Sequence, residues 1–257
     1  MADRVVAIIQ ARMGSSRLPG KVLRDIHGKP MLVWVIERAQ RAKSVTETVV
    51  ATTIDEGDDI LEQVCRSYHI PCLRGNVYDV LDRYYQIARE VEADVIVRLT
   101  ADCPLIDPDL IDLVVQRFQE EKVDFAANRL PPPYQRTYPI GLDVEVVSFS
   151  ALEKAWKEAK EKHEREHVLP YLYEEPGRFR TLTVDHEVDL GSLRWTVDTP
   201  QDLAFVREVI ARLPDKETFT WLDVLKLVED DPNLSKINAD VHHKSFIDVD
   251  ERAKDVD

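Results

Sequence analysis

The residues VVAIIQARMGSSRLPGK, from Val5 to Lys21, decide the fold. They begin with an apolar, largely β-branched run, which predicts a buried first strand. The run leads directly into a loop that holds two glycines, two serines and three cationic side chains. Backbone N–H groups and cations in such a loop can surround a polyphosphate. We therefore expect a phosphate-binding loop at the end of the first strand.

This loop differs from the P-loop of ATPases and kinases, whose pattern is G-x-x-x-x-G-K-[ST]. Gly14 and Gly20 are separated by five residues, and Val22 stands where that motif has a magnesium-binding hydroxyl. Pro19 also stiffens the loop. The sequence thus predicts a different phosphate-binding loop, the alternative being a surface loop with solvated cations.

Composition narrows the class of protein. A chain of 257 residues with 44% apolar content can form one large α/β domain or two small ones. Its net charge of −14 argues against a nucleic-acid binder, whose surface is basic. No apolar run approaches the roughly 20 residues of a membrane span, and no long apolar signal-peptide region is apparent. Three cysteines without metal spacing indicate a reducing compartment, so we expect a cytoplasmic protein without membrane partners.

Strand-like and helix-like segments alternate along the chain, which predicts an α/β fold with a mostly parallel central sheet flanked by helices. The expected strands are 5–10, 48–53, 72–74, 95–99, 141–148, 178–184 and 193–197. The expected helices are 31–41, 58–68, 77–91, 108–121, 150–162, 201–213 and 221–228. We expect one domain over residues 1–233 and a polar tail over 234–257, partly disordered or docked through Phe246 and Ile247.

Two carboxylates follow predicted strands. Asp102 comes after strand 95–99, and Asp198 comes after strand 193–197. In open α/β sheets the ligand lies beyond the carboxyl ends of the strands, and Mg²⁺ takes one or two carboxylates together with substrate phosphates. Both are therefore candidate magnesium ligands. The alternative role of Asp102 and Asp198 is capping of a turn or a helix, although Thr199 could cap the helix in place of Asp198. For a third carboxylate, Asp107, we favour capping, because Pro108 follows it.

Two other motifs suggest different chemistry. His163 to His167 spells H-E-x-x-H, the zinc-peptidase signature, but charged residues precede it, Pro170 follows, and Glu187 is the only candidate third ligand that we single out. A glycosyltransferase that uses a nucleotide-sugar typically carries D-x-D at a strand end. Residues 107–109 have that spacing but are better explained by capping, and residues 248–250 lie in the tail. A non-catalytic nucleotide-binding protein is a third alternative.

Several motifs together resemble the spore-coat polysaccharide synthesis protein F family, which is cytidylyltransferase-like and related to the synthetases of CMP-activated sugar acids. The resemblance covers about residues 4–235. It rests on the first loop and on TADCPLID (100–107), RGNVYDVLDRY (74–84), RTYPIGLDVEVVS (136–148), REHVLPYLYEEPGRF (165–179) and WTVDTPQDL (195–203).

The resemblance implies a Rossmann-like nucleotidyltransferase fold and Mg²⁺-dependent transfer of CMP from CTP to a sugar acid or another small hydroxylated or phosphorylated acceptor. Pyrophosphate leaves, and the product serves polysaccharide or surface-glycan synthesis. The choice of cytosine rests on the family alone. A homodimer, joined through the strand near residues 142–146, is an open possibility.

The resemblance also implies roles for individual residues. Arg12, Arg17 and Lys21 are expected to be the catalytic cations, since nucleotidyl transfer requires charge neutralisation and in-line positioning more than a covalent nucleophile. Asp102 and Asp198 are the implied metal ligands, and Arg136, Tyr138 and Asp143 are acceptor candidates. The implied nucleotide-binding residues are Gln10, Ala11, Arg12, Gly14, Ser15, Ser16, Arg17, Lys21, Gly75 and Arg83.

Overall fold

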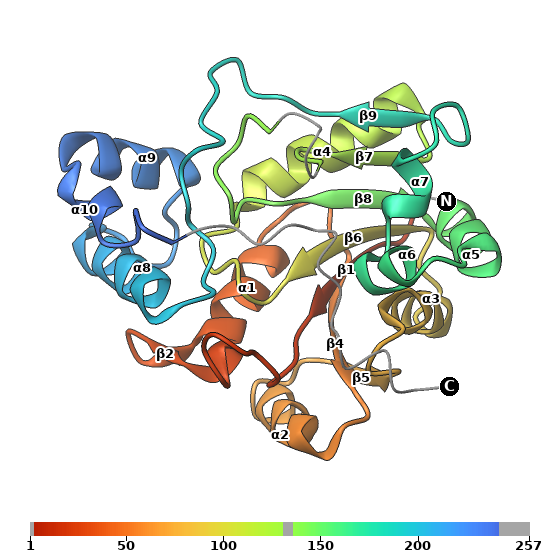
Figure 1. The fold of residues 1–257 in the computed structure, drawn as a ribbon, viewed down its shortest axis with the longest axis horizontal. Helices are drawn as coiled ribbons and strands as arrows, with labels where there is room; N and C mark the ends of the chain where they lie inside the picture. Colours follow the sequence, from red (N-terminus) through yellow and green to blue (C-terminus); the bar gives the residue numbers. More distant parts are fainter. Residues whose placement is uncertain (1–2, 131–135, 242–257) are drawn as a thin grey trace.

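A computed structural model describes residues 3–130 and 136–241 and arranges them around a seven-stranded sheet (Figure 1). The strand order is β5-β4-β1-β6-β8-β7-β9, and only β8 runs antiparallel to its neighbours. This confirms the predicted mostly parallel α/β sheet. The strands are β1 (Val5–Gln10), β4 (Glu47–Thr53), β5 (Cys72–Gly75), β6 (Val95–Thr100), β7 (Phe125–Ala127), β8 (Glu145–Ser148) and β9 (Thr181–Thr183).

Helices cover both faces of the sheet, and each face has its own core cluster. Alternate residues of β1 pack into the two clusters: Ala7 and Ile9 belong to one, and Val6 and Ile8 belong to the other. Burial on both faces explains the uninterrupted apolar run of this strand. The first cluster includes residues of α1 (Met31–Gln40), α2 (Asp59–Ser67), α4 (Pro108–Glu121), α8 (Pro200–Arg212), α9 (Trp221–Asp230) and α10 (Asn233–Lys236); the second includes residues of α3 (Val80–Glu90), α5 (Phe149–Glu158) and α7 (Pro170–Tyr173).

Short elements complete the fold. Two 3₁₀ turns, η1 (Lys21–Leu23) and η2 (Glu56–Asp58), flank the first loop and the end of β4, and α6 (Lys162–His167) packs on α3. Strands β2 (Asp25–Ile26) and β3 (Lys29–Pro30) form a separate hairpin. Over residues 3–130 and 136–241, no helix is both long and apolar enough to cross a membrane.

The predicted strand 193–197 is wrong. In the structure this segment makes only an isolated bridge between Ile140 and Arg194. Its backbone N–H groups donate to three separate acceptors. The N–H of Leu193 donates to Leu190 O, that of Trp195 to Ile140 O, and that of Val197 to Asp102 O. A β-ladder needs one continuous partner, so the segment stays irregular although its side chains are buried.

The predicted strand 141–148 is shorter than expected, because β8 begins only at Glu145. The side chain of Asn128 accepts the N–H of Val144 across 2.8 Å and donates to Leu142 O across 2.7 Å. These bonds occupy the backbone groups that a longer strand would pair. Strand β7, which pairs with β8, was not predicted, because its three residues are too few to show a period.

The expected boundary between domain and tail crosses α10. Beyond the boundary, Leu234 is 1% exposed and Asn238 is 5% exposed, and both pack against the body of the protein. The expected docking residues Phe246 and Ile247 lie outside the described residues.

Candidate active site

The loop after β1 is held in a fixed shape by backbone bonds. Gly20 has a φ of +65°, which disfavours any side chain, and its N–H donates to Met13 O across 3.1 Å. Asp58 of η2 accepts the N–H of Met13 across 2.7 Å. Leu18 and Val22 are buried. The loop therefore turns back on itself and directs Lys21 toward the carboxyl edge of the sheet.

Lys21 lies at the centre of the site. Its Nζ donates to Asp102 Oδ2 across 2.7 Å, to Asp198 Oδ1 across 2.7 Å and to Val197 O across 3.0 Å. The side chains of Lys21, Asp102 and Asp198 are 12%, 26% and 16% exposed. One cation thus holds together the two carboxylates that were predicted from the sequence to share a metal.

The electrostatics of this cluster are mutually supportive. Burial by itself lowers the pKa of Lys21, but the charges of Asp102 and Asp198 outweigh it, so the pKa is raised. Burial likewise opposes ionisation of Asp198, yet Lys21, Arg17 and Arg194 hold its pKa well below the usual range. The raised pKa of Lys21 and the lowered pKa of Asp198 both favour the charged form of this pair.

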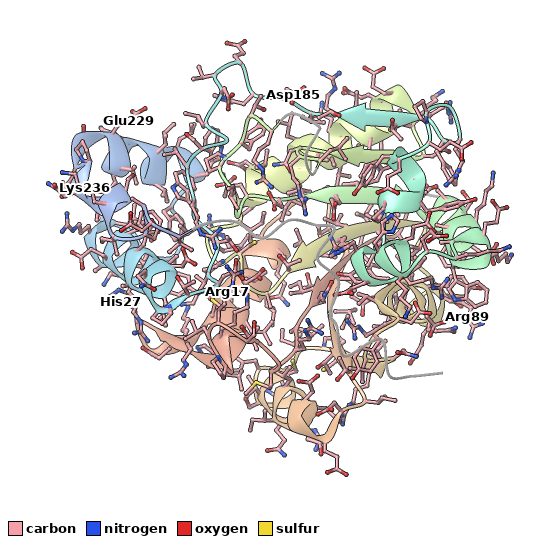
Figure 2. All side chains as sticks on the ribbon, in the orientation of Figure 1. Arg17, His27, Arg89, Asp185, Glu229 and Lys236 are labelled. Carbon is pink, nitrogen blue, oxygen red and sulfur yellow. The ribbon has the colours of Figure 1, made fainter. Side chains whose placement is uncertain are left out.

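Two arginines extend the cluster. Nη2 of Arg17 lies 3.0 Å from Asp198 Oδ2, and Nη2 of Arg194 donates to the same oxygen across 2.8 Å. Figure 2 labels Arg17 near the middle of the molecule. Arg17 is 29% exposed, so it remains accessible to an anionic ligand.

Arg12 lies between two neighbouring cavities, which it lines together with Val77 and Tyr78. The larger, of about 330 Å³, is also lined by Gly14, Thr53 and Asp55 among others. The smaller, of about 170 Å³, includes Gln10, Arg98, Glu166 and His167. The expected nucleotide-binding residues Gln10, Arg12 and Gly14 therefore border hollows at the strand ends.

The remaining residues of the loop differ in what they can offer a ligand. Gly14 is exposed, and an added Cβ would meet no atom within 4 Å, which leaves space beside its backbone. Ser16 is exposed, whereas Ser15 Oγ accepts the N–H of Leu18 across 3.4 Å. Ala11 is buried, and its N–H donates to Ala51 O across 3.0 Å. The available donors thus lie on the outer part of the loop.

Gly75 and Arg83, the two predicted nucleotide-binding residues outside segment 10–21, lie close together. An added Cβ on Gly75 would lie 2.8 Å from Cγ of Arg83. Arg83 is fully buried and donates to Asn76 O across 2.8 Å, but its Nε and Nη2 have no hydrogen-bond partner among the described residues. Burial lowers the pKa of Arg83 to about 10.

The acceptor candidates separate into two places. Arg136 and Asp143 form a bidentate pair, with distances of 2.7 and 3.4 Å, before the start of β8. Tyr138 is 4% exposed and packs edge-on against Trp221 and His186. The contacts of Tyr138 are those of a core residue, and its acceptor role stays a prediction.

The alternative motifs find no support in the described part of the chain. There, no group of three His, Cys, Asp or Glu side chains could hold a metal. His163 of H-E-x-x-H bonds instead to Glu174 across 2.9 Å. Asp107 caps α4 through the N–H groups of Asp109 and Leu110, as the capping interpretation predicted. Residues 248–250 lie outside the described chain.

The donor set fits a hard divalent cation. Asp102 Oδ2, Asp198 Oδ1 and Val197 O converge on one positive charge, and all three are oxygen atoms. Mg²⁺ is usually bound in proteins by one or two carboxylates, with substrate phosphates and water completing its shell. Lys21 Nζ therefore marks a position at which such an ion is compatible with the residues present.

Sequence reasoning missed four residues that support this cluster: Asp58, Arg194, Asp202 and Asn238. Asp58 was assigned only to the start of a helix, and Arg194 to a strand. Asp202 is the third residue of α8 in T-P-Q-D, a capping-box position that could have indicated a local role. No pattern in the sequence singles out Asn238.

A family model described as cytidylyltransferase matches residues 6–215, which include the loop, Asp102 and Asp198. The chain belongs to the cytidylyltransferase family. This confirms the predicted family relationship and the expectation of an enzyme that transfers a nucleotidyl group. The match ends before α9, so the last part of this cytidylyltransferase lies outside the family model.

Relatives of this cytidylyltransferase include the spore coat polysaccharide biosynthesis protein SpsF of Bacillus subtilis, 30% identical over 89% of this chain and 95% of that protein. An uncharacterized protein of Methanocaldococcus jannaschii is 35% identical over 96% of this chain and 100% of its own length. A solved cytidylyltransferase from Leptospira borgpetersenii aligns with a TM-score of 0.86 at 33% identity, covering 94% of this chain and all of that one. A solved CMP:2-keto-3-deoxy-manno-octonic acid synthetase in complex with CTP aligns with a TM-score of 0.62 at 25% identity, covering 81% and 99%.

Proposed function

We propose that this cytidylyltransferase transfers CMP from CTP to a sugar acid or another small hydroxylated or phosphorylated acceptor, with Mg²⁺ and release of pyrophosphate, in the synthesis of a polysaccharide precursor. The observation that carries the proposal is the convergence of Lys21, Asp102 and Asp198 at the end of the glycine- and serine-containing loop. CTP and the sugar acid are supported by the synthetase solved with CTP, and the polysaccharide by the Bacillus subtilis relative.

The cations have separate tasks in this reaction. Arg17 and Arg12 can bind the triphosphate at two oxygens each, because a guanidinium group presents a planar fork of donors. Lys21 offers a compact charge beside the two carboxylates. Together they stabilise the charge that develops on the departing pyrophosphate.

Asp102 and Asp198 would hold Mg²⁺. When bound, this ion neutralises phosphate oxygens and lowers the pKa of an acceptor hydroxyl. The outer face of the loop, at Gly14 and Ser16, is open to phosphate oxygens. The cavities beside Arg12 offer room for the nucleoside and the acceptor.

The first experiment identifies the substrates. A thermal-shift screen of the four nucleoside triphosphates with Mg²⁺ should give the largest stabilisation with CTP. A screen of sugar acids and phosphorylated polyols should then find an acceptor with which pyrophosphate release requires CTP, Mg²⁺ and the acceptor together. Turnover of a nucleotide-sugar without pyrophosphate release would instead indicate a glycosyltransferase, and binding without turnover would indicate a non-catalytic nucleotide-binding protein.

The second experiment tests the site. Asp102→Ala should abolish pyrophosphate release, whereas Asp109→Asn, which changes an exposed carboxylate on α4, should keep it. Full activity of Asp102→Ala on the identified acceptor would overturn the site assignment.

A further inference from the structure

Asp198 is oriented by a buried network as well as by its cationic partners. Its backbone N–H donates to Asp202 Oδ2 across 3.0 Å, and its carboxylate accepts from Arg194, which itself bonds to both oxygens of Asp202. Asp202 has no exposed surface. The orientation of Asp198 therefore depends on the position of the Asp202 carboxylate.

Asn238 holds this network from a distant part of the chain. Its Nδ2 donates to Asp202 Oδ1 and to Arg194 O, both across 3.0 Å. A side-chain amide nitrogen carries two hydrogens, and here each faces an oxygen that can only accept, so the orientation of the amide is unambiguous. Asn238 thus fixes the main chain of Arg194 and the carboxylate that holds its guanidinium group.

We propose that Asn238 is a positioning residue of the active site, which fixes Asp198 through Asp202 and Arg194. The inference rests on the proposed function, because it concerns Asp198 as a metal ligand. It also goes beyond the family match, which ends at residue 215. The segment after α9 therefore completes a site whose other members all come from the matched region.

Because the network is buried, the hydrogen bonds that Asn238 donates are not readily replaced by water. The segment that carries Asn238 packs beside Arg194 and Trp195, where it borders a cavity of about 300 Å³. Without the amide, Asp202 Oδ1 loses one of the two donors that it has among the described residues and keeps the bond from Arg194 Nε, and Arg194 O loses the bond from Nδ2. A buried carboxylate that loses a hydrogen-bond donor is destabilised in its position and shifts, and Arg194 and Asp198 would shift with it.

The test compares Asn238→Ala with Asn233→Ala, which removes an exposed asparagine from the same short segment. Mn²⁺ serves as the metal probe, and its binding in the presence of CTP is followed by electron paramagnetic resonance. Because loss of a residue behind a metal ligand typically weakens metal affinity by 10–100-fold, we expect the Mn²⁺ dissociation constant of Asn238→Ala to rise about tenfold. Asn233→Ala should bind Mn²⁺ as the wild type does.

Each result has a defined meaning. Asn238→Ala with a lowered melting temperature and unchanged Mn²⁺ affinity would show a merely structural role and overturn the inference, while the proposed function would stand. A wild type that binds no Mn²⁺ with CTP would overturn the proposed function, and the inference with it. If Asn238→Ala does not fold, Asn238→Ser, which keeps one donor, takes its place. A higher Mn²⁺ dissociation constant of this variant would support the inference, and an unchanged one would overturn it.

Discussion

Lys21 and Asp102 are 81 residues apart in the sequence, yet the Nζ of one lies 2.7 Å from Oδ2 of the other. The pair joins the loop after β1 to the turn after β6, two strands that lie side by side in the sheet. A positive charge thus occupies the position at which we propose a metal ion, so lysine and metal share the same carboxylates.

We expect Lys21→Ala to have two opposite effects. Pyrophosphate release should fall by about 10²–10³-fold, since a cation beside the developing charge is lost. Mn²⁺ binding without nucleotide should become tighter, because the ammonium group no longer competes for Asp102 and Asp198. Lys29→Ala, which removes a β3 lysine paired with Glu37 of α1, is the control and should change neither quantity. Weaker Mn²⁺ binding by Lys21→Ala would contradict the competition.

The lowered pKa of Asp198 predicts how stability depends on pH. Burial opposes the charge of Asp198, but Lys21, Arg17 and Arg194 outweigh burial. The pKa of Asp198 is therefore lower in the native protein than in the unfolded chain, where it is near 3.8. The contribution of Asp198 is complete above that value and is lost as the pH falls below it. Asp198→Asn should therefore lose less unfolding free energy than the wild type between about pH 5 and pH 3. Urea unfolding at the two pH values measures this, and parallel losses in both proteins would contradict it.

Two glycines of the loop should respond differently to alanine. Gly20→Ala places a side chain at a φ of +65° and 3.2 Å from Cε of Met13, so we expect a loss of about 1 kcal/mol in unfolding free energy. Gly14→Ala meets no atom within 4 Å and should keep its stability while the KM for CTP rises, because the methyl group fills the space beside the loop. Urea unfolding and steady-state kinetics separate the two effects. Equal stability of Gly20→Ala and Gly14→Ala would contradict the conformational argument.

We expect the buried charge of Arg83 to lower the unfolding free energy of the protein while it contributes to CTP binding. Arg83 is fully buried, and two of its nitrogens lack a hydrogen-bond partner among the described residues. Arg83→Met removes that charge at similar volume, so we expect about 1 kcal/mol greater unfolding free energy and weaker CTP binding. Calorimetry of CTP binding and urea unfolding provide the two measurements. A variant that is less stable yet binds CTP normally would assign Arg83 to packing alone.

Local sequence patterns predicted much of the fold and the central site. β1 and α4 have the predicted bounds, because an apolar run and an Asp-Pro start are complete signals within a few residues. Asp102 and Asp198 were identified from the acidic residues after apolar runs, although the run before Asp198 is not a strand. The bond from Val197 N to Asp102 O brings the two segments together, and the parallel pairing of β1 with β6 places the Lys21 loop beside Asp102.

Other features depend on contacts that no local pattern encodes. Asn238 lies 36 residues from Asp202 and 44 from Arg194, and a single asparagine in a polar segment gives no sign of either bond. The truncation of β8 likewise depends on Asn128, which binds backbone groups 14 and 16 residues away. Such residues are recognised only once the chain is folded.

The reversed direction of β8 has a consequence for the diversity of such enzymes. β7 ends at Ala127 and β8 begins at Glu145, and these two residues are paired at the edge where Asp102 lies. The intervening chain therefore leaves and re-enters the sheet at adjacent points beside the chemistry. Its described side chains are mostly buried, among them Asn128, Tyr138 and Leu142, so both ends of this excursion belong to the core. Of the described side chains, only the partly exposed ones, such as Arg136 and Asp143, can change beside the site without repacking the fold.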